Sequence, residues 1–378
     1  MSAQSRLRWS PFKRPEAIEP PPPSEFSHDG LPTYDLDQRF YPDRRIVGLH
    51  ILAYVIPSIL LGALLAYSLA PSIFRRVPTD LTRTRVLLDA LHKPGARPEV
   101  AVLGSSIAMN GVDARRLRSD LPGQPLVYNL SSPQQSLAES LLYYQNLPSS
   151  VKVVVDVVIT ETLQPPHPHS PCIDPNTFNA FYMYGYRPKP STVQTLSTDC
   201  GRPTHDLLTE SRLEQTFNSR WALHQWADSV VFRKIQKNAG ANRVVNDLYF
   251  PAFLPQVTPA QQEVQFRQFN TPAPDVGYSL SPENRALIRS AAEINARAGR
   301  RFVVVFAPLH PRMQRFYGPK YLADLQRLAT SSDLGPNTSV VDLTTLLSAD
   351  QFVDRLHANA DGASRLTDAI AAGLPGVR

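Results

Sequence analysis

Pro98-Glu-Val-Ala-Val-Leu-Gly-Ser-Ser-Ile-Ala-Met-Asn110 is the stretch from which the architecture of most of this chain can be worked out. Residues 100–103 are apolar and mostly β-branched, which predicts a short buried strand. Gly104 permits a sharp turn, and Ser105 and Ser106 follow where a helix can begin. A hydroxyl there would lie at the carboxyl edge of a sheet, where open α/β folds bind their ligands. Two interpretations stay open from this stretch alone: the serines cap the next helix, or one of them is a nucleophile.

Four later apolar runs repeat the strand pattern. They lie at residues 126–129, 151–159, 301–307 and 340–343. In the second of these runs only Lys152 and Asp156 are charged, which is typical of a strand buried on both faces of a sheet. Helices are predicted at 81–91, 112–121, 282–298 and 363–374, and a further one ends near residue 146. This alternation predicts an α/β fold with a mainly parallel five-stranded sheet in three α/β/α layers.

The alternation fails between about residues 164 and 281, which we interpret as an insertion that packs over the catalytic edge of the sheet. Residues 207–235 have apolar side chains at helical spacing, including Leu213, Phe217 and Trp221. Such a stripe more often belongs to a core than to a platform for a ligand, so burial of these side chains is predicted.

The first 70 residues have a composition of their own. Residues 1–45 are Pro-rich and poor in clustered aliphatic side chains, so they cannot bury enough apolar surface to offset their ordering entropy, and disorder is predicted. Residues 46–70 contain no Asp, Glu, Lys or Arg, and their length suits a helix that spans a bilayer. A buried helix of a water-soluble domain is the alternative.

Basic residues on the two sides of this run predict its orientation. Arg39, Arg44 and Arg45 precede it, and Arg75 and Arg76 follow it. The balance favours an amino terminus on the cytoplasmic side. The sequence therefore predicts a signal anchor, with a disordered tail in the cytoplasm and a domain over residues 71–378 on the other side of the membrane.

Composition limits the remaining classes of function. The chain has 378 residues, a net charge of +6 and a pI near 9.3, but no stripe of Lys and Arg with interleaved aromatics, so a nucleic-acid partner is not expected. Cys172 and Cys200 form neither a CxxC pair nor a zinc pattern. Outside the cytosol they could form a disulfide, and two unrelated buried thiols are the alternative. No metal and no cofactor are expected.

The chemistry is predicted from the other end of the chain. A serine hydroxyl needs a base that takes its proton, and the base works best when a third group fixes its tautomer. Phe352-Val-Asp-Arg-Leu-His357 offers both groups, because Asp354 and His357 are close enough in a turn for the carboxylate to accept from the imidazole. The motif is weak by itself. It gains weight because it follows a fifth strand in a domain that opens with strand-Gly-Ser-Ser.

With these motifs the chain resembles the SGNH (GDSL-like) hydrolase superfamily, which has a flavodoxin-like α/β fold. It is most similar to the membrane-anchored members beside bacterial systems for alginate acetylation and teichoic-acid D-alanylation. The resemblance implies that Ser106 is the nucleophile, His357 the base and Asp354 the group that orients it. It covers about residues 98–160 and 300–374, and the insertion resembles no known segment.

The chain departs from the family pattern at the oxyanion hole. The family uses the serine amide, a glycine amide and an asparagine side chain there. Gln134 takes the place of the glycine and Thr160 that of the asparagine, while Asn129 ends the second strand as a candidate substrate contact. Loss of one good donor costs about 3 kcal/mol in the transition state, so the resemblance implies a slow hydrolase or a transferase completed by a partner.

The other histidines have simpler interpretations. His167 and His169 could bind a metal, but exposed positions in a proline-rich loop are the expectation. His310 follows the fourth strand at the functional edge, where it could contact the substrate. Arg312 and Arg315 could bind an anionic polymer, with a solvated charged loop as the default.

The resulting hypothesis is a serine esterase or O-acyltransferase that acts on acyl groups, chiefly O-acetyl groups, of a cell-surface polysaccharide. The resemblance implies that its anchor lies in a bacterial inner membrane and that its domain over residues 71–378 is periplasmic. A membrane-bound O-acyltransferase or a polymer synthase would be its partner. Two alternatives stay open: a non-catalytic assembly or polymer-binding factor, and an esterase for lipids or small esters.

Overall fold

The computed structural model describes residues 51–74, 82–95, 97–159, 163, 171–218, 247–249, 256–269, 281–331, 334–335 and 337–374. The chain divides into two units, residues 1–60 and 61–378, and the second unit contains the sheet. The predicted disordered tail, residues 1–45, lies outside the described residues.

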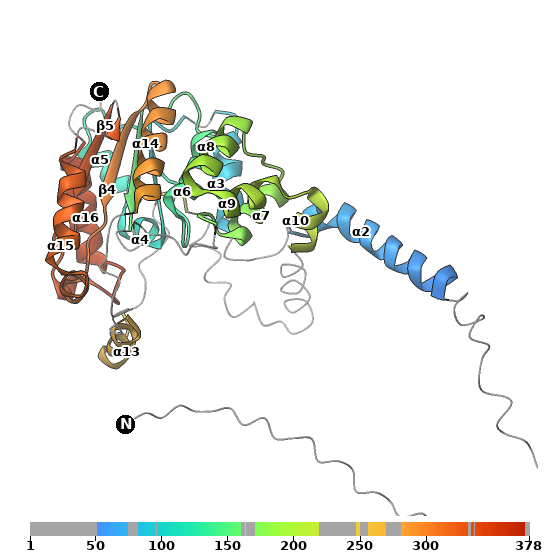
Figure 1. Cartoon of the computed structure of the whole chain (residues 1–378). Coiled ribbons are helices and arrows are strands. Elements are labelled where there is room, and N and C mark those ends of the chain that lie inside the picture. Colours follow the sequence, from blue (N-terminus) through green and yellow to red (C-terminus); the bar gives the residue numbers. More distant parts are fainter. Residues whose placement is uncertain are drawn as a thin grey trace, which may run out of the picture. The chain divides into compact units, whose positions relative to one another are not determined.

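Five parallel strands form one sheet in the order β2-β1-β3-β4-β5 (Figure 1). They are β1 (Val100–Gly104), β2 (Val127–Asn129), β3 (Val153–Val158), β4 (Arg301–Phe306) and β5 (Thr338–Asp342). The predicted α/β fold and its five-stranded parallel sheet are therefore confirmed. The chain moves from β1 outward to β2 and returns to β3 on the other side of β1. The carboxyl ends of β1 and β3 thus flank the point where the strand order reverses, which is where doubly wound sheets bind ligands.

Successive side chains of the central strands point to opposite faces of the sheet, and each face has its own core. Val100 and Val102 pack with α4 (Ser106–Gly111), α5 (Ala114–Asp120) and α16 (Ala360–Ala372). Ala101 and Leu103 pack on the opposite face. The helices of that second face are α3 (Thr82–His92), α6 (Leu137–Tyr144), α14 (Pro282–Arg297) and α15 (Pro311–Ala329). Burial on both faces explains why these strands have continuous apolar sequences.

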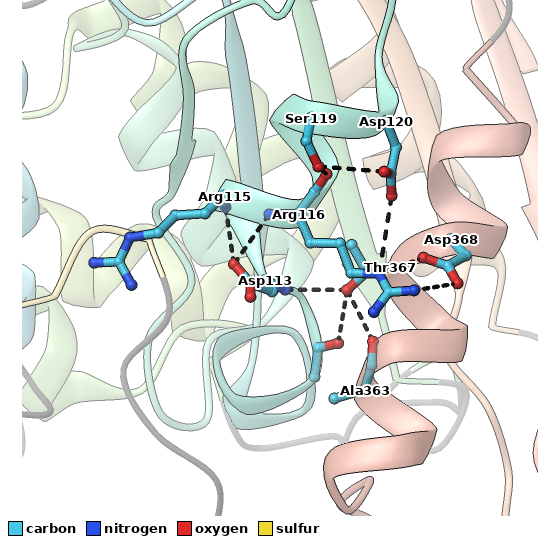
Figure 2. Close-up of polar contacts among 9 residues, drawn as sticks. Asp113, Arg115, Arg116, Ser119, Asp120, Ala363, Thr367 and Asp368 are labelled. Carbon is cyan, nitrogen blue, oxygen red and sulfur yellow. Dashed lines mark hydrogen bonds and ion pairs between the residues drawn. The ribbon is translucent and has the colours of Figure 1, made fainter.

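Two helices on the first face, α5 and α16, hold together the two segments of the chain that contain the candidate catalytic residues. Asp113 caps α5, and its backbone N–H donates to Thr367 Oγ1 of α16 at 3.1 Å. Arg116 of α5 makes two contacts with the carboxylate of Asp368, at 2.6 and 2.8 Å. Figure 2 shows this cluster, in which Thr367 also donates to the carbonyl of Ala363. The segment after the nucleophile candidate is therefore attached to the segment after the base candidate.

Three parts of the insertion are described: residues 171–218, 247–249 and 256–269. The first part is helical: α7 (Pro175–Met183), α8 (Pro190–Cys200), α9 (Arg202–Thr209) and α10 (Arg212–Asn218). Through Phe178, Phe181 and Leu196 it joins the core of the second face. In the second part, the carbonyl of Leu248 accepts from the N–H of Asn129 at the end of β2. The third part contains α13 (Pro259–Phe269), which joins the same core through Phe266 and accepts from the Arg355 N–H through Gln265. Residues 247–249 and α13 therefore fit the prediction of an insertion over the carboxyl edge of the sheet, and helices α7–α10 do not.

Two expectations about the insertion and the segment after β4 are wrong. Leu213 and Phe217 are 62% and 66% exposed on α10, so this part of the predicted apolar stripe is not core. Trp221 and Trp226 lie outside the described residues. Arg312 and Arg315 belong to the first turns of α15 and not to a solvated loop.

The amino-terminal helix consists of a π-helical segment, Ile51–Val55, followed by α2, Ile56–Phe74. Several of its large apolar side chains are exposed, among them Ile59, Leu60 and Leu64. In the described part of the chain, no helix has both the length and the apolar character needed to cross a bilayer. The predicted span begins at residue 46, outside the described residues, and the membrane anchor stays a prediction.

Candidate active site

The nucleophile candidate is held by the junction between β1 and α4. Ser105 is buried and is the N-cap of α4, where its hydroxyl accepts from the backbone N–H of Ile107 at 3.2 Å. Ser106 is the first residue of the helix, and its hydroxyl does not cap it. The two interpretations of these serines thus apply to one residue each: Ser105 caps the helix, which leaves Ser106 Oγ free to meet a base.

Gly104 allows this junction to pack closely against β3. Its φ of 136° lies in a region that residues with a side chain rarely adopt. A Cβ at this position would collide with the carbonyl oxygen of Val157 and would lie 3.0 Å from Cβ of Ala108. Any larger residue would therefore push the start of α4, and Ser106 with it, away from the sheet.

The base candidate lies in a short loop between β5 and α16. An isolated antiparallel bridge between Phe352 and Ala358 closes the loop, and the Val353 N–H donates to the His357 carbonyl at 2.9 Å. Within it, Oδ1 of Asp354 accepts from the backbone N–H groups of Leu356 and His357, both at 2.7 Å. The acid therefore builds the turn with one oxygen and keeps the other available. Residues 352–358 are called the catalytic loop below.

Two hydrogen bonds connect the acid, the imidazole and the serine. Asp354 Oδ2 is 2.8 Å from His357 Nδ1, and His357 Nε2 is 2.8 Å from Ser106 Oγ. The side chains of both loop residues are only 15% exposed. The structure thus brings together the three residues proposed as a triad, with His357 between the other two. This is the arrangement in which an imidazole can take the serine proton while the carboxylate fixes its tautomer.

Asp354 is ionised under ordinary conditions. Burial would raise its pKa, but the hydrogen bond with the His357 imidazole, the backbone N–H groups of His357 and Leu356 and the attraction of His357 outweigh burial. The net result is a pKa below the usual value of an aspartate. A negative charge on Asp354 is what stabilises the imidazolium that forms when His357 takes a proton.

Gln134 lies in the loop that follows β2. Ser132 in the same loop donates its N–H to the carbonyl of Gly104 at 3.1 Å, which fixes the loop against the end of β1. Gln134 itself is exposed and has a φ of 59°, in the left-handed region where glycine is usual. The backbone at this position therefore has a conformation that usually requires glycine. Thr160, the other oxyanion candidate, lies outside the described residues.

Asn129 does not face the substrate. Its side chain is fully buried, and Nδ2 donates to the carbonyls of Ala108 at 3.1 Å and Val112 at 2.9 Å. Its Oδ1 accepts from the N–H of Ser131 at 3.1 Å. The predicted substrate contact is therefore not supported, because backbone groups already occupy both ends of the amide. Asn129 instead attaches α4 to the end of β2.

A buried arginine supports the same loop and was missed from the sequence. Arg83 of α3 is fully buried, and its guanidinium donates to the carbonyls of Ser131, Asn129 (2.9 Å) and Asp247 (3.0 Å). Burial lowers its pKa to about 10, with attraction to Tyr143 and Asp247 opposing the shift, so the side chain stays charged at neutral pH. Nothing in the sequence around Arg83 distinguishes it from an exposed helical arginine.

His310 is the N-cap of α15 and not a substrate contact. It is 4% exposed, and its Nδ1 accepts from the N–H of Arg312 at 3.1 Å. Its ring lies between the rings of Phe266 and Phe352, with centroid distances of 4.7 and 5.1 Å. Burial, together with the charges of Arg312 and Arg315, lowers the pKa of His310 to about 4, against the attraction of Asp354. His310 is therefore neutral at pH 7.

The remaining predictions concern the two cysteines, two histidines and metal binding. Cys172 and Cys200 form a disulfide between the segment before α7 and the end of α8. His167 and His169 lie outside the described residues. In the described ranges, no group of three or more His, Cys, Asp or Glu side chains could hold a metal ion.

Comparison with known proteins adds no family to this geometry. No protein-family model matches the chain, and no curated protein matches it. The function therefore has to be inferred from the chemistry of the site.

Proposed function

We propose that this protein is a serine-dependent acyl esterase or O-acyltransferase. The observation that carries the proposal is the series of two 2.8 Å hydrogen bonds from Ser106 through His357 to Asp354. Ser106 stands at the carboxyl end of β1, beside the point where the strand order reverses. The strand order 2-1-3-4-5 is the flavodoxin-like order, which agrees with the resemblance to the SGNH superfamily.

The reaction would run in two halves. His357 Nε2 takes the proton of Ser106 while the serine oxygen attacks the acyl carbonyl, and the same imidazole then returns the proton to the leaving alcohol. An acyl group on Ser106 is the intermediate. In the second half a sugar hydroxyl or water gives its proton to His357 and attacks the acyl group, which restores Ser106. Developing negative charge on the carbonyl oxygen would be met by backbone N–H groups, with those of Ser106 and Gln134 as candidates.

The acceptor and the cellular setting belong to the same proposal. We infer an O-acyl group on a cell-surface polysaccharide as the substrate, from the resemblance to membrane-anchored polymer-acylation proteins. A helix that begins within the uncharged run 46–70 and exposes large apolar side chains supports an anchor in the inner membrane. A membrane-bound O-acyltransferase or a polymer synthase is the expected partner, since Thr160 replaces a good oxyanion donor of the family.

The test uses neighbouring serines as a matched pair. A fluorophosphonate probe should label Ser106 in the full-length protein, and Ser106→Ala should abolish both labelling and hydrolysis of p-nitrophenyl acetate. Ser105→Ala should still be labelled, although loss of the N-cap lowers the free energy of unfolding by about 1 kcal/mol. Two results together would contradict the catalytic proposal and favour a non-catalytic assembly factor. The probe would fail to label the wild-type protein, and cells that carry Ser106→Ala would still acylate their polysaccharide.

A further inference from the structure

We propose that helix α13 of the insertion is a clamp on the catalytic loop, and that Phe266 and His310 are positioning residues for His357. This inference rests on the proposed function, because it concerns how the base of that reaction is held. The clamp comprises Gln256 and Val257, which precede α13, and Glu263, Gln265 and Phe266 on the helix.

The backbone of the catalytic loop is held from outside by the segment around α13. The Gln256 side-chain amide donates to the carbonyls of Phe352 and Val353, both at 3.2 Å. The Val257 N–H also donates to the Val353 carbonyl at 3.2 Å, and Oε1 of Gln265 accepts from the Arg355 N–H at 3.3 Å. The loop is thus bound at its first two residues, Phe352 and Val353, and in its middle, at Arg355. Arg355 is the residue between Asp354 and the two backbone N–H groups that Asp354 accepts.

A row of rings connects α13 to the base of the same loop. Phe266 is 1% exposed and packs against His310, which in turn packs against Phe352. Phe352 is the first residue of the catalytic loop and is bridged to Ala358, directly after His357. A shift of Phe266 would therefore displace the buried rings of His310 and Phe352 and, with them, both ends of the loop, because a close-packed interior leaves no space to absorb the movement.

An ion pair seats Phe266 in this row. The guanidinium of Arg312 lies 4.1 Å from the centre of the Phe266 ring and 2.6 Å from Oε2 of Glu263, one turn earlier on α13. Since the N–H of Arg312 also donates to His310, one residue of α15 fixes both Phe266 and His310. The clamp thus joins an element without resemblance to known segments to the residues that carry the chemistry.

Four variants of the full-length protein test the clamp. Phe266→Ala removes the ring, Phe266→Leu restores most of its apolar volume, and Glu263→Gln removes the partner of Arg312. Val264→Ala is the matched control, because Val264 is on the same helix and 55% exposed. Each variant is assayed with p-nitrophenyl acetate, and kcat is expressed per site titrated with a fluorophosphonate. This normalisation removes the part of any loss that comes from unfolded protein.

We expect Phe266→Ala to lower kcat per titrated site at least tenfold with KM within twofold, and Glu263→Gln to lower it about two- to threefold. Phe266→Leu should retain a third or more, and Val264→Ala should match wild type. Unchanged kcat per site in Phe266→Ala, or a rise in KM alone, would overturn the clamp.

A spectroscopic measurement separates this proposal from the proposed function. An imidazole proton held between His357 Nδ1 and Asp354 gives a proton resonance at very low field, which requires no turnover. Phe266→Ala should broaden or remove this resonance, and Val264→Ala should keep it. If the wild-type protein has the resonance but no esterase activity, the proposed function fails while the clamp can still be judged. If the resonance is the same in all variants, the clamp is wrong although Ser106 reacts.

Discussion

The two carboxylate oxygens of Asp354 accept different hydrogen bonds, and this difference determines which substitution tests the residue. Oδ1 accepts two backbone N–H groups that form the turn, and Oδ2 accepts from the His357 imidazole. In Asp354→Asn the backbone groups would still require an oxygen on their side. The side-chain NH2 would then face His357 Nδ1, which forces the proton of the neutral imidazole onto Nε2.

Asp354→Asn should therefore lower kcat by about 10⁴ while leaving the fold intact, because the protonated Nε2 can no longer accept from Ser106. Ser106→Ala should cost more, since the nucleophile itself is lost. Steady-state hydrolysis of p-nitrophenyl acetate and thermal unfolding of both variants make the comparison. A loss in Asp354→Asn of less than tenfold would mean that the carboxylate does not orient the base.

Asp156 is a buried acid that the reaction does not use, and it should make stability depend on pH. It accepts from the hydroxyl of Tyr144 at 2.6 Å, and burial raises its pKa to about 6 despite this bond and that from Ser140. Between about pH 4 and 6 the unfolded chain has released this proton and the folded protein has not, so stability falls as pH rises through this range.

Asp156→Asn should remove this dependence. An amide can accept from Tyr144 and donate to Ser140, so the network is kept without the charge. From pH 4 to pH 7 the free energy of unfolding of the variant should rise relative to wild type by about 3 kcal/mol. Urea unfolding of both proteins at several pH values measures the difference, and other titrating groups cancel. A difference that does not change with pH would contradict the raised pKa.

At this scale the sequence predicted the residues of the triad but not their supports. Asp354 and His357 are three residues apart in one turn, and Ser106 follows a strand and a glycine. These short patterns, together with the order of the predicted strands, were enough to predict the three residues. Asn129 was predicted to contact substrate, but its partners are carbonyls of α4, and no local pattern shows where that helix returns. The burial of Arg83 could not be predicted either, because its carbonyl partners are distant in the sequence.

At the level of elements, all five strands lie where the apolar runs predict them. For β1, β3 and β4 the reason is burial on both faces of the sheet, which leaves a continuous apolar signal. Helix α15 was not predicted, and its sequence contains Pro311 and the pair Gly318-Pro319, which usually interrupt a helix. Pro311 instead occupies the first turn, and the helix continues past a kink at Gly318 with a φ of 79°. Apolar residues at helical spacing were the available signal: Met313, Tyr317, Tyr321, Leu325 and Leu328.

The contact between α5 and α16 gives a prediction about two neighbouring bonds. Thr367→Val keeps the shape of a buried side chain but leaves the N–H of Asp113 without an acceptor, so the free energy of unfolding should fall by about 1–2 kcal/mol. Arg116→Ala removes the exposed ion pair with Asp368 and should have a much smaller effect, which salt further reduces. Urea unfolding compares the two. Equal effects would show that the hydroxyl is not what joins these helices.

At the scale of the whole molecule, the sequence predicted the presence of an insertion but not which parts of the domain each of its segments contacts. Its first helices join the core on one face of the sheet. Helix α13 joins the same core through Phe266 and also contacts the catalytic loop, where Gln265 and Arg355 are 90 residues apart in the chain. Contacts between such distant segments have no period or spacing in the sequence. The disulfide within the first part connects residues 28 positions apart, which constrains α7 and α8 and leaves α13 independent of it.

The membrane topology is the prediction that concerns the entire chain. If residues 46–70 are a signal anchor with the basic flank inside, the domain with Ser106 lies in the periplasm. Alkaline phosphatase fused after Arg378 should then be active, since this enzyme needs an oxidising compartment. Under the same conditions Cys172 and Cys200 should resist alkylation until a reductant is added, because an oxidising compartment preserves their disulfide.

The matched control is a fusion after Arg45, which keeps the Pro-rich tail and lacks the uncharged run. It should give no phosphatase activity, because nothing would carry the enzyme across the membrane. Inactive fusions at both positions, with a fluorescent cytosolic reporter bright after Arg378, would place the domain in the cytosol. Acyl transfer to a cell-surface polysaccharide would then be ruled out even if Ser106 is a reactive nucleophile, since donor site and acceptor would lie on opposite sides of the membrane.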